Sequence, residues 1–217
     1  MGTIRTVSDR NEPMLENGPT NGFCTIVLAH GAGAPRDNEF MTFVAAGLAD
    51  QGFRVVRFEF PYMALRRQTE KKRPPDREPV LRKTWLDVIG SLGSPEKIII
   101  GGKSMGGRIA SLIADEAQVA GLVCLGYPFH PTGKPDKLRT EHLKSLATPT
   151  LILQGERDSF GKPEEVATYG LPRRLTIEWI PDGDHTFNPP NAPSLTSDEH
   201  LAPALTALAT LYNSPLA

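Results

Sequence analysis

A glycine-rich stretch around Ser104 has the residue types that can turn a serine into a nucleophile. Its sequence is Gly102-Lys103-Ser104-Met105-Gly106-Gly107, directly after the apolar run 97–101. The pattern Gly-x-Ser-x-Gly between a strand and a helix is typical of a sharp turn that strains the serine backbone and exposes its hydroxyl. The flanking glycines let strand and helix approach without a Cβ clash. The spacing therefore makes Ser104 a candidate nucleophile.

Two other interpretations of this stretch must be weighed. Gly-Lys-Ser also ends the phosphate-binding loop of nucleotide-binding proteins, but that loop needs a glycine where this chain has Lys97. The isoleucines at 98–100 form strands and are unsuited to cradle a phosphate. The other alternative is a glycine-rich turn without chemistry. Only suitable partner residues elsewhere in the chain favour a nucleophile over such a turn.

Two residues later in the chain are the predicted partners of Ser104. A hydroxyl needs a base to take its proton, and the base needs a carboxylate to orient it. Asp158 follows the apolar run 150–154, with Glu156 as the alternative, and His185 follows the run 175–180. The order Ser, Asp, His is the order of the triad in α/β-hydrolases. We therefore predict Ser104 as nucleophile, His185 as base and Asp158 as the orienting carboxylate.

Backbone N–H groups are expected to stabilise the oxyanion that forms during the attack. One is the N–H of Met105, and the other is that of Ala32, with Gly33 as the alternative, in the loop that begins with His30-Gly31. We expect no metal ion and no organic cofactor. Apolar side chains after the same strands are candidates for the substrate pocket, with ordinary core packing as the alternative for each. They are Tyr62, Met63, Tyr127, Phe129, Phe160 and Phe187.

Several charged residues near these motifs have more than one possible role. Lys103 and Arg139 could bind an anionic group of the substrate, or Lys103 could be a surface charge beside the turn. The basic segment 61–79 is either a solvated surface loop or a rim that attracts phosphate or carboxylate. The sequence assigns no role to His130 or His142.

Alternating elements are expected to position these residues. Apolar runs predict strands at 24–29, 54–60, 97–102, 119–125, 150–154 and 175–180, and helical spacing predicts helices at 38–51, 80–92, 105–117 and 198–211. This alternation predicts an α/β fold, a three-layer sandwich with a mostly parallel central sheet and no large cap domain. We expect an N-terminal segment at 1–21 and a single domain at 22–217. Ligands of such sheets bind beyond the carboxyl ends of the strands.

Composition limits the classes of partner. The net charge of −1 gives no global attraction to nucleic acid or to an anionic membrane. The two cysteines lie in apolar runs and are predicted to be free thiols of a reducing compartment. No apolar run approaches membrane-spanning length, and residues 1–21 lack the apolar stretch of a secretory signal. We therefore expect a cytoplasmic protein that binds neither nucleic acid nor membrane, and no feature indicates an oligomeric state.

With these motifs in order, the chain resembles the α/β-hydrolase superfamily over residues 22–213. The stretches Gly-Lys-Ser-Met-Gly-Gly-Arg, Gly-Tyr-Pro-Phe-His-Pro and Arg139-Thr140-Glu141-His142-Leu143 resemble a narrower group. That group comprises bacterial predicted hydrolases, eukaryotic testis-expressed proteins and a subunit of a chromatin acetyltransferase complex. The chain is more distantly similar to dienelactone-hydrolase-like enzymes, which have cysteine in place of Ser104. The resemblance implies a Ser-His-Asp esterase-type hydrolase, and it implies that some relatives serve as scaffolds.

The sequence therefore predicts a serine hydrolase that cleaves a small-molecule carboxylic ester or thioester through an acyl-enzyme intermediate. A peptidase or a C–C hydrolase with the same triad is one alternative, because specificity resides in the pocket. A non-catalytic interaction module with the same fold is the other.

Overall fold

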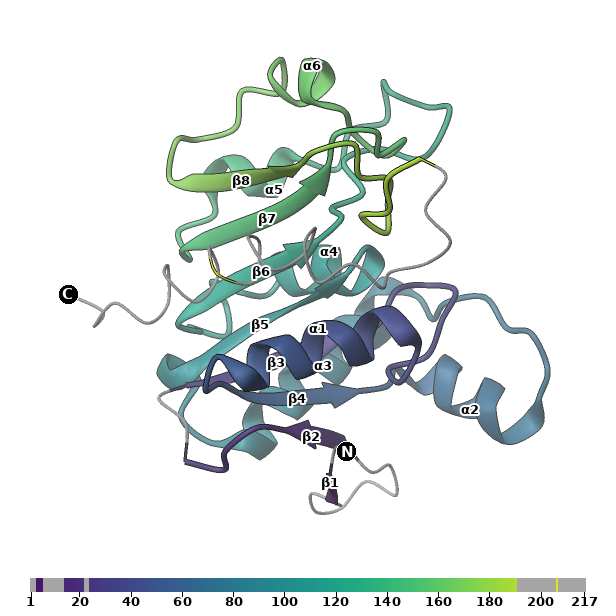
Figure 1. Cartoon of the computed structure of the whole chain (residues 1–217), viewed down its shortest axis with the longest axis vertical. Helices are drawn as coiled ribbons and strands as arrows, with labels where there is room; N and C mark the ends of the chain where they lie inside the picture. Colours follow the sequence, from purple (N-terminus) through teal and green to yellow (C-terminus); the bar gives the residue numbers. More distant parts are fainter. Residues whose placement is uncertain (1–2, 6–13, 22–23, 191–205, 207–217) are drawn as a thin grey trace.

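An eight-stranded sheet runs through the middle of the molecule (Figure 1). The computed structural model describes residues 3–5, 14–21, 24–190 and 206. The strands of the sheet are β1 (Thr3–Arg5), β2 (Met14–Asn17), β3 (Thr25–Ala29), β4 (Arg54–Phe58), β5 (Ile98–Lys103), β6 (Gly121–Leu125), β7 (Thr150–Gly155) and β8 (Leu175–Ile180). Their spatial order is β1-β2-β4-β3-β5-β6-β7-β8. Strands β3 to β8 are mutually parallel, whereas β1 and β2 pair antiparallel at one edge. The prediction of a mostly parallel sheet is confirmed.

Helices cover both faces of this sheet. They are α1 (Glu39–Asp50), α2 (Pro61–Thr69), α3 (Glu78–Leu92), the 3₁₀ helix η1 (Pro95–Lys97), α4 (Met105–Ser111), α5 (Glu141–Ser145) and α6 (Pro163–Val166). Figure 1 shows α1 in front of the sheet and α3 and α4 behind it. Because strand side chains alternate between faces, Ile99 packs in the core under α1, while Ile98 and Ile100 pack in the core under α3 and α4. This is the predicted three-layer sandwich.

Three segments differ from the prediction. Residues 61–69 form α2 instead of a solvated loop, because Pro61 suits a first helical turn and Tyr62, Met63 and Ala64 are buried. The helix expected at 105–117 ends at Ser111, where the hydrogen bonds change to three-residue spacing. The helix expected at 198–211 lies outside the described residues, apart from residue 206. In the described ranges, no helix is long and apolar enough to cross a membrane.

The parallel strands bring the candidate residues to one edge of the sheet. The loop at 30–38 follows β3, Ser104 follows β5, Asp158 follows β7, and His185 follows β8. Since β3, β5, β6, β7 and β8 are parallel neighbours, their carboxyl ends lie together. Only short helices interrupt the connections after β6 and β7, so there is no large cap domain at this edge.

Candidate active site

Ser104 occupies a strained turn between β5 and α4. Its backbone has φ 50° and ψ −113°, a left-handed conformation that costs a non-glycine residue about 1–3 kcal/mol. Its N–H donates to the carbonyl of Leu125 at 3.0 Å, which fixes the turn against β6. A Cβ at Gly102 or at Gly106 would lie 2.1 Å or 2.5 Å from the carbonyl oxygen of Ala29. Both glycines are therefore required for the close approach of β5 and α4 to β3.

Asp158 and His185 form a hydrogen-bonded pair at the same edge. The imidazole Nδ1 lies 2.7 Å from Asp158 Oδ2, the carboxylate is fully buried, and the His185 side chain is 25% exposed. An ionised carboxylate only accepts hydrogen bonds, so Nδ1 bears the proton and Nε2 keeps a free lone pair. Glu156, the alternative carboxylate, is exposed and accepts the N–H of Asp182 instead. The structure thus pairs His185 with Asp158 and leaves Nε2 available as a base.

The segment Leu125-Gly126 connects this pair to the serine turn. The carbonyl of Leu125 accepts the Ser104 N–H, and a Cβ at Gly126 would lie 3.2 Å from Cε1 of His185. The φ of 67° at Gly126 is also one that favours glycine. The His185 imidazole therefore lies against Gly126, the residue after Leu125, whose carbonyl binds the Ser104 N–H.

Gln154 is a site residue that the sequence analysis missed. Its side chain is fully buried, and its amide nitrogen donates to Asp158 Oδ2 at 2.9 Å. Its amide oxygen accepts the N–H of Tyr127 at 2.7 Å. With the N–H of Phe160 on Oδ1 at 2.9 Å, the carboxylate of Asp158 accepts three hydrogen bonds. The available signal was a glutamine at the end of an otherwise apolar strand.

The loop after β3 exposes two candidate oxyanion donors. The hydroxyl of Tyr62 lies 3.3 Å from the carbonyl oxygen of Gly31 and 3.1 Å from that of Ala32, so both carbonyls face α2. In a trans peptide the N–H points opposite to the C=O, and the N–H groups of Ala32 and Gly33 therefore point away from α2. Neither has a hydrogen-bond partner within the described ranges. A Cβ at Gly31 would lie 3.8 Å from that of Ser104, so this loop borders the serine.

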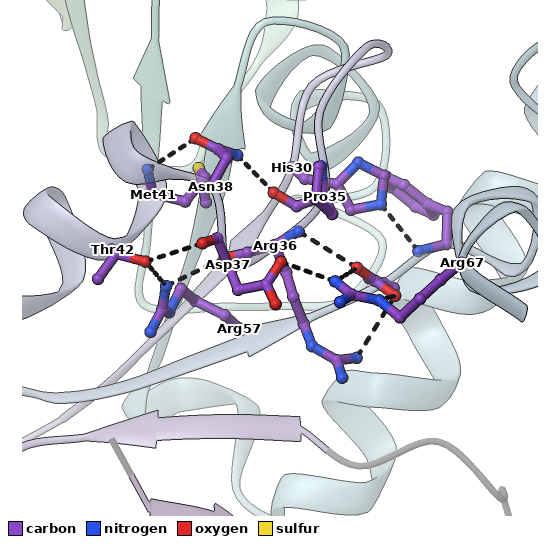
Figure 2. Close-up of polar contacts among 11 residues, drawn as sticks. His30, Pro35, Arg36, Asp37, Asn38, Met41, Thr42, Arg57 and Arg67 are labelled. Carbon is purple, nitrogen blue, oxygen red and sulfur yellow. Dashed lines mark hydrogen bonds and ion pairs between the residues drawn. The ribbon is translucent and has the colours of Figure 1, made fainter. Parts of the chain in front are cut away.

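The same loop is fixed at both ends, as Figure 2 shows. Arg67 of α2 binds Glu59 and Asp37, each with an N–O distance of 2.7 Å. At the other end, Nε2 of His30 accepts the N–H of Phe60 at 3.1 Å. Burial lowers the pKa of His30, which keeps the ring neutral and able to accept. His30 therefore has a structural role, and α2 with residues 59–60 after β4 determines where the loop with the candidate oxyanion donors lies.

We predict that Tyr62→Phe loosens this loop. Removing a hydroxyl that serves two carbonyls should lower the free energy of unfolding by about 1 kcal/mol. Turnover should fall about 3–10-fold, a fraction of the 10²–10³-fold effect of deleting a whole oxyanion donor. Urea unfolding measures the first effect, and the rate of substrate turnover measures the second. The matched control is Tyr169→Phe, since the Tyr169 hydroxyl is buried without a partner among the described residues. Equal turnover in both variants would contradict the role given to Tyr62.

Most of the predicted pocket side chains lie in the core. Tyr62, Met63, Tyr127, Phe129 and Phe187 are each at most 3% exposed, so core packing, the alternative for each, describes their surroundings. Phe187 packs on Phe40 of α1, with ring centroids 5.6 Å apart. Phe160 differs, because it is partly exposed and its ring lies 4.5 Å from the His185 imidazole. Phe160 is therefore the one of the six that borders the site with accessible surface.

The prediction that Lys103 is a surface charge is wrong. As the last residue of β5, it shares the α1 face with Ile99, because strand side chains alternate. Its side chain is buried, and its ammonium donates to the carbonyl of His185. It also lies 5.6 Å from the ring centroid of Phe40 and 5.9 Å from that of Phe187. Lys103 is therefore not a surface charge, and its ammonium is bound to a backbone carbonyl.

Burial lowers the pKa of Lys103 to about 7, against the opposing effect of the Asp158 and Asp184 carboxylates. In the unfolded chain a lysine pKa is about 10.4. Between these values the unfolded state binds more protons, so stability should rise with pH, by at most about 1.4 kcal/mol per pH unit. We expect this rise in the difference between wild type and Lys103→Met, measured by urea unfolding at pH 7, 8 and 9. A difference that is constant with pH would contradict a buried lysine whose pKa is lowered.

The side chains of His142 and His130 and the backbone of Arg139 have structural partners. The Nε2 of His142 lies 2.8 Å from Ser111 Oγ, and burial lowers the pKa of this histidine to about 4. His130 is buried, with Nε2 3.6 Å from a carboxylate oxygen of Glu165. The carbonyl of Arg139 accepts the hydroxyl of Tyr127 at 2.9 Å. Among the described residues, no group of three or more His, Cys, Asp or Glu side chains could bind a metal ion.

Comparisons with known proteins place the chain in a family. A family profile described as an alpha/beta hydrolase domain matches residues 23–213. The fold is similar to an alpha-beta serine hydrolase homologue from Coxiella burnetii, with a TM-score of 0.66 and 18% identity over 97% of this chain and 94% of that one. A dienelactone hydrolase from Anabaena variabilis has a TM-score of 0.64 and 21% sequence identity, over 97% of this chain and 93% of that one. Est1E from Butyrivibrio proteoclasticus has a TM-score of 0.67 and 13% sequence identity, over 97% of this chain and 96% of that one. With a profile match over most of its length, the chain belongs to the alpha/beta hydrolase family.

Proposed function

We propose that the protein is a serine hydrolase that cleaves small carboxylic esters or thioesters. The observation that supports this most is the strained Ser104 turn, joined through Leu125-Gly126 to the hydrogen-bonded Asp158–His185 pair. A strained turn is retained where the surrounding structure determines it, and such turns cluster at functional sites.

In the proposed reaction, Oγ of Ser104 attacks the carbonyl carbon while Nε2 of His185 takes the hydroxyl proton. Asp158 orients the ring and stabilises the imidazolium. The imidazolium then gives this proton to the leaving alkoxide or thiolate, and the acyl group stays on Ser104. A water molecule, deprotonated by His185, attacks the acyl-enzyme and releases the acid.

The oxyanion of both tetrahedral intermediates would accept the N–H groups of Met105 and Ala32, with Gly33 as the alternative. Met105 is the first residue of α4, so its N–H precedes the first helical hydrogen bond. Ala32 and Gly33 are exposed and their N–H groups face away from α2, which supports the assignment.

Relatives support an ester or thioester substrate. Structural neighbours include an esterase domain from Rhodothermus marinus and a thioesterase domain from the curacin biosynthetic pathway. The partly exposed ring of Phe160 beside His185 favours an apolar acyl or aryl group on that side. Peptidase or C–C hydrolase activity would use the same triad with a different pocket.

Hydrolysis of a panel of p-nitrophenyl esters and acyl thioesters tests the proposal. We expect at least one substrate to be cleaved by the wild type well above the rate of Ser104→Ala. A folded wild-type protein that cleaves no ester or thioester faster than that variant would contradict the proposal and favour a non-catalytic interaction module.

A further inference from the structure

The loop that contains His185 is bound from two sides by cations. On one side, Arg157 Nε donates to the carbonyl of Asp182 at 2.7 Å, and a second guanidinium nitrogen donates to that of Asn188 at 3.0 Å. On the other side, Lys103 donates to the carbonyl of His185 itself. Arg157 is exposed, whereas Lys103 is buried. The contact of Lys103 with His185 is therefore the more buried of the two.

The surroundings of Lys103 leave its ammonium little freedom. The rings of Phe40 and Phe187 lie 5.6 Å and 5.9 Å from Nζ. A Cβ at Gly126 would lie 2.7 Å from Nζ and 3.0 Å from the His185 carbonyl oxygen. The Lys103 ammonium thus fills a tight space between the two aromatic rings, Gly126 and the backbone of His185.

Retaining a cation in such a place has a cost. Desolvating an ammonium is unfavourable, and Lys103 has no carboxylate at contact distance among the described residues. A methionine of similar length would fill the same space without a charge. The contact with the His185 carbonyl is the feature of Lys103 that such a methionine would lack.

We propose that Lys103 is a positioning residue for the reaction, which fixes the backbone of His185 while Asp158 fixes its ring. The inference rests on the proposed function, since it assigns Lys103 to the geometry of that triad. Because both the carbonyl and Nδ1 of His185 are bound, movement of the imidazole relative to Gly126 is restricted. Displacement of a reacting group by about 1 Å can reduce a rate by 10²-fold.

Three variants separate this role from ordinary packing. Lys103→Met removes the donor but keeps the volume, Lys103→Gln keeps an N–H donor without the charge, and Arg157→Met removes two cation–carbonyl bonds from the same loop. We expect Lys103→Met to lower kcat about 10–100-fold with KM within about 2-fold. Its melting temperature should equal or exceed that of the wild type. Lys103→Gln should recover part of kcat, and Arg157→Met should lose stability with kcat near that of the wild type.

Nuclear magnetic resonance of the His185 Nδ1 proton gives a readout without turnover. We expect this resonance to shift or broaden in Lys103→Met and to remain as in the wild type in Arg157→Met. A Lys103→Met protein with wild-type kcat and an unchanged resonance would overturn the inference, as would equal loss of kcat in Arg157→Met. If the wild type is no faster than Ser104→Ala, the proposed function fails, and the resonance still decides whether Lys103 positions His185.

Discussion

Replacement of Ser104 by alanine should reduce hydrolysis of p-nitrophenyl acetate by about 10⁴–10⁶-fold, by analogy with other triads. The variant loses the attacking oxygen. Its backbone conformation should stay the same, because a φ of 50° is as unfavourable for alanine as for serine. Circular dichroism and melting temperature should therefore match those of the wild type.

A matched serine variant controls for this measurement. Ser145 is exposed on α5, where its hydroxyl donates to the carbonyl of His142 at 3.3 Å. Ser145→Ala should keep wild-type turnover. Turnover at the wild-type rate in Ser104→Ala would show that Ser104 is not the nucleophile.

Replacement of Asp158 by asparagine should reduce kcat by about 10⁴-fold, the size of effect known for the corresponding change in a Ser-His-Asp triad. The carboxylate accepts hydrogen bonds on both oxygens, from His185 and Gln154 on Oδ2 and from the Phe160 N–H on Oδ1. An asparagine amide facing His185 would oppose the Nδ1–H donor and favour the wrong tautomer. An amide turned the other way would oppose the N–H of Phe160, so neither orientation satisfies the site.

The control for this variant is Glu156→Gln. Glu156 is the other carboxylate of the same loop, but it is exposed and binds the N–H of Asp182. Its removal should leave kcat within about 3-fold of the wild type, since surface interactions contribute little. A larger loss of kcat in Glu156→Gln than in Asp158→Asn would reverse the assignment of the orienting carboxylate.

Much of the fold was predictable because buried parallel strands are apolar almost throughout. The isoleucines at 98–100 and the apolar run 150–154 are typical of strands with both faces buried, and the structure has strands there. The strands β1 and β2 could not be found in this way. β2 includes Glu16 and Asn17 and lies near an antiparallel edge, where an apolar run is not required.

The segment 61–69 was mistaken for a loop because it belongs to the basic, proline-containing stretch 61–79. The buried part of α2 consists of three consecutive residues, Tyr62 to Ala64, so it lacks the three- and four-residue spacing that predicts a helix. The function of Tyr62 could not be predicted either, because its hydroxyl serves carbonyls about thirty residues earlier in the chain. Such contacts depend on tertiary packing, which has no signature in the local spacing.

The roles of Gln154 and Lys103 show what a motif search leaves out. Both are polar residues at the ends of apolar strands, and both are buried against the proposed triad. Counting by two from Ile99 would have placed Lys103 on the α1 face. No counting rule would have identified the carbonyl of His185 as its partner, because 82 residues separate the two.

Reaction of the purified protein with a fluorophosphonate tests the central claim most directly. The reagent forms a covalent adduct with an activated serine, and mass spectrometry of the digested protein identifies the residue. We predict one adduct per chain, on the peptide that contains Ser104, and no adduct in Ser104→Ala or in an enzyme whose His185 is replaced by alanine. A correctly folded wild-type protein that stays unlabelled, or that is labelled on a different serine, would contradict the account.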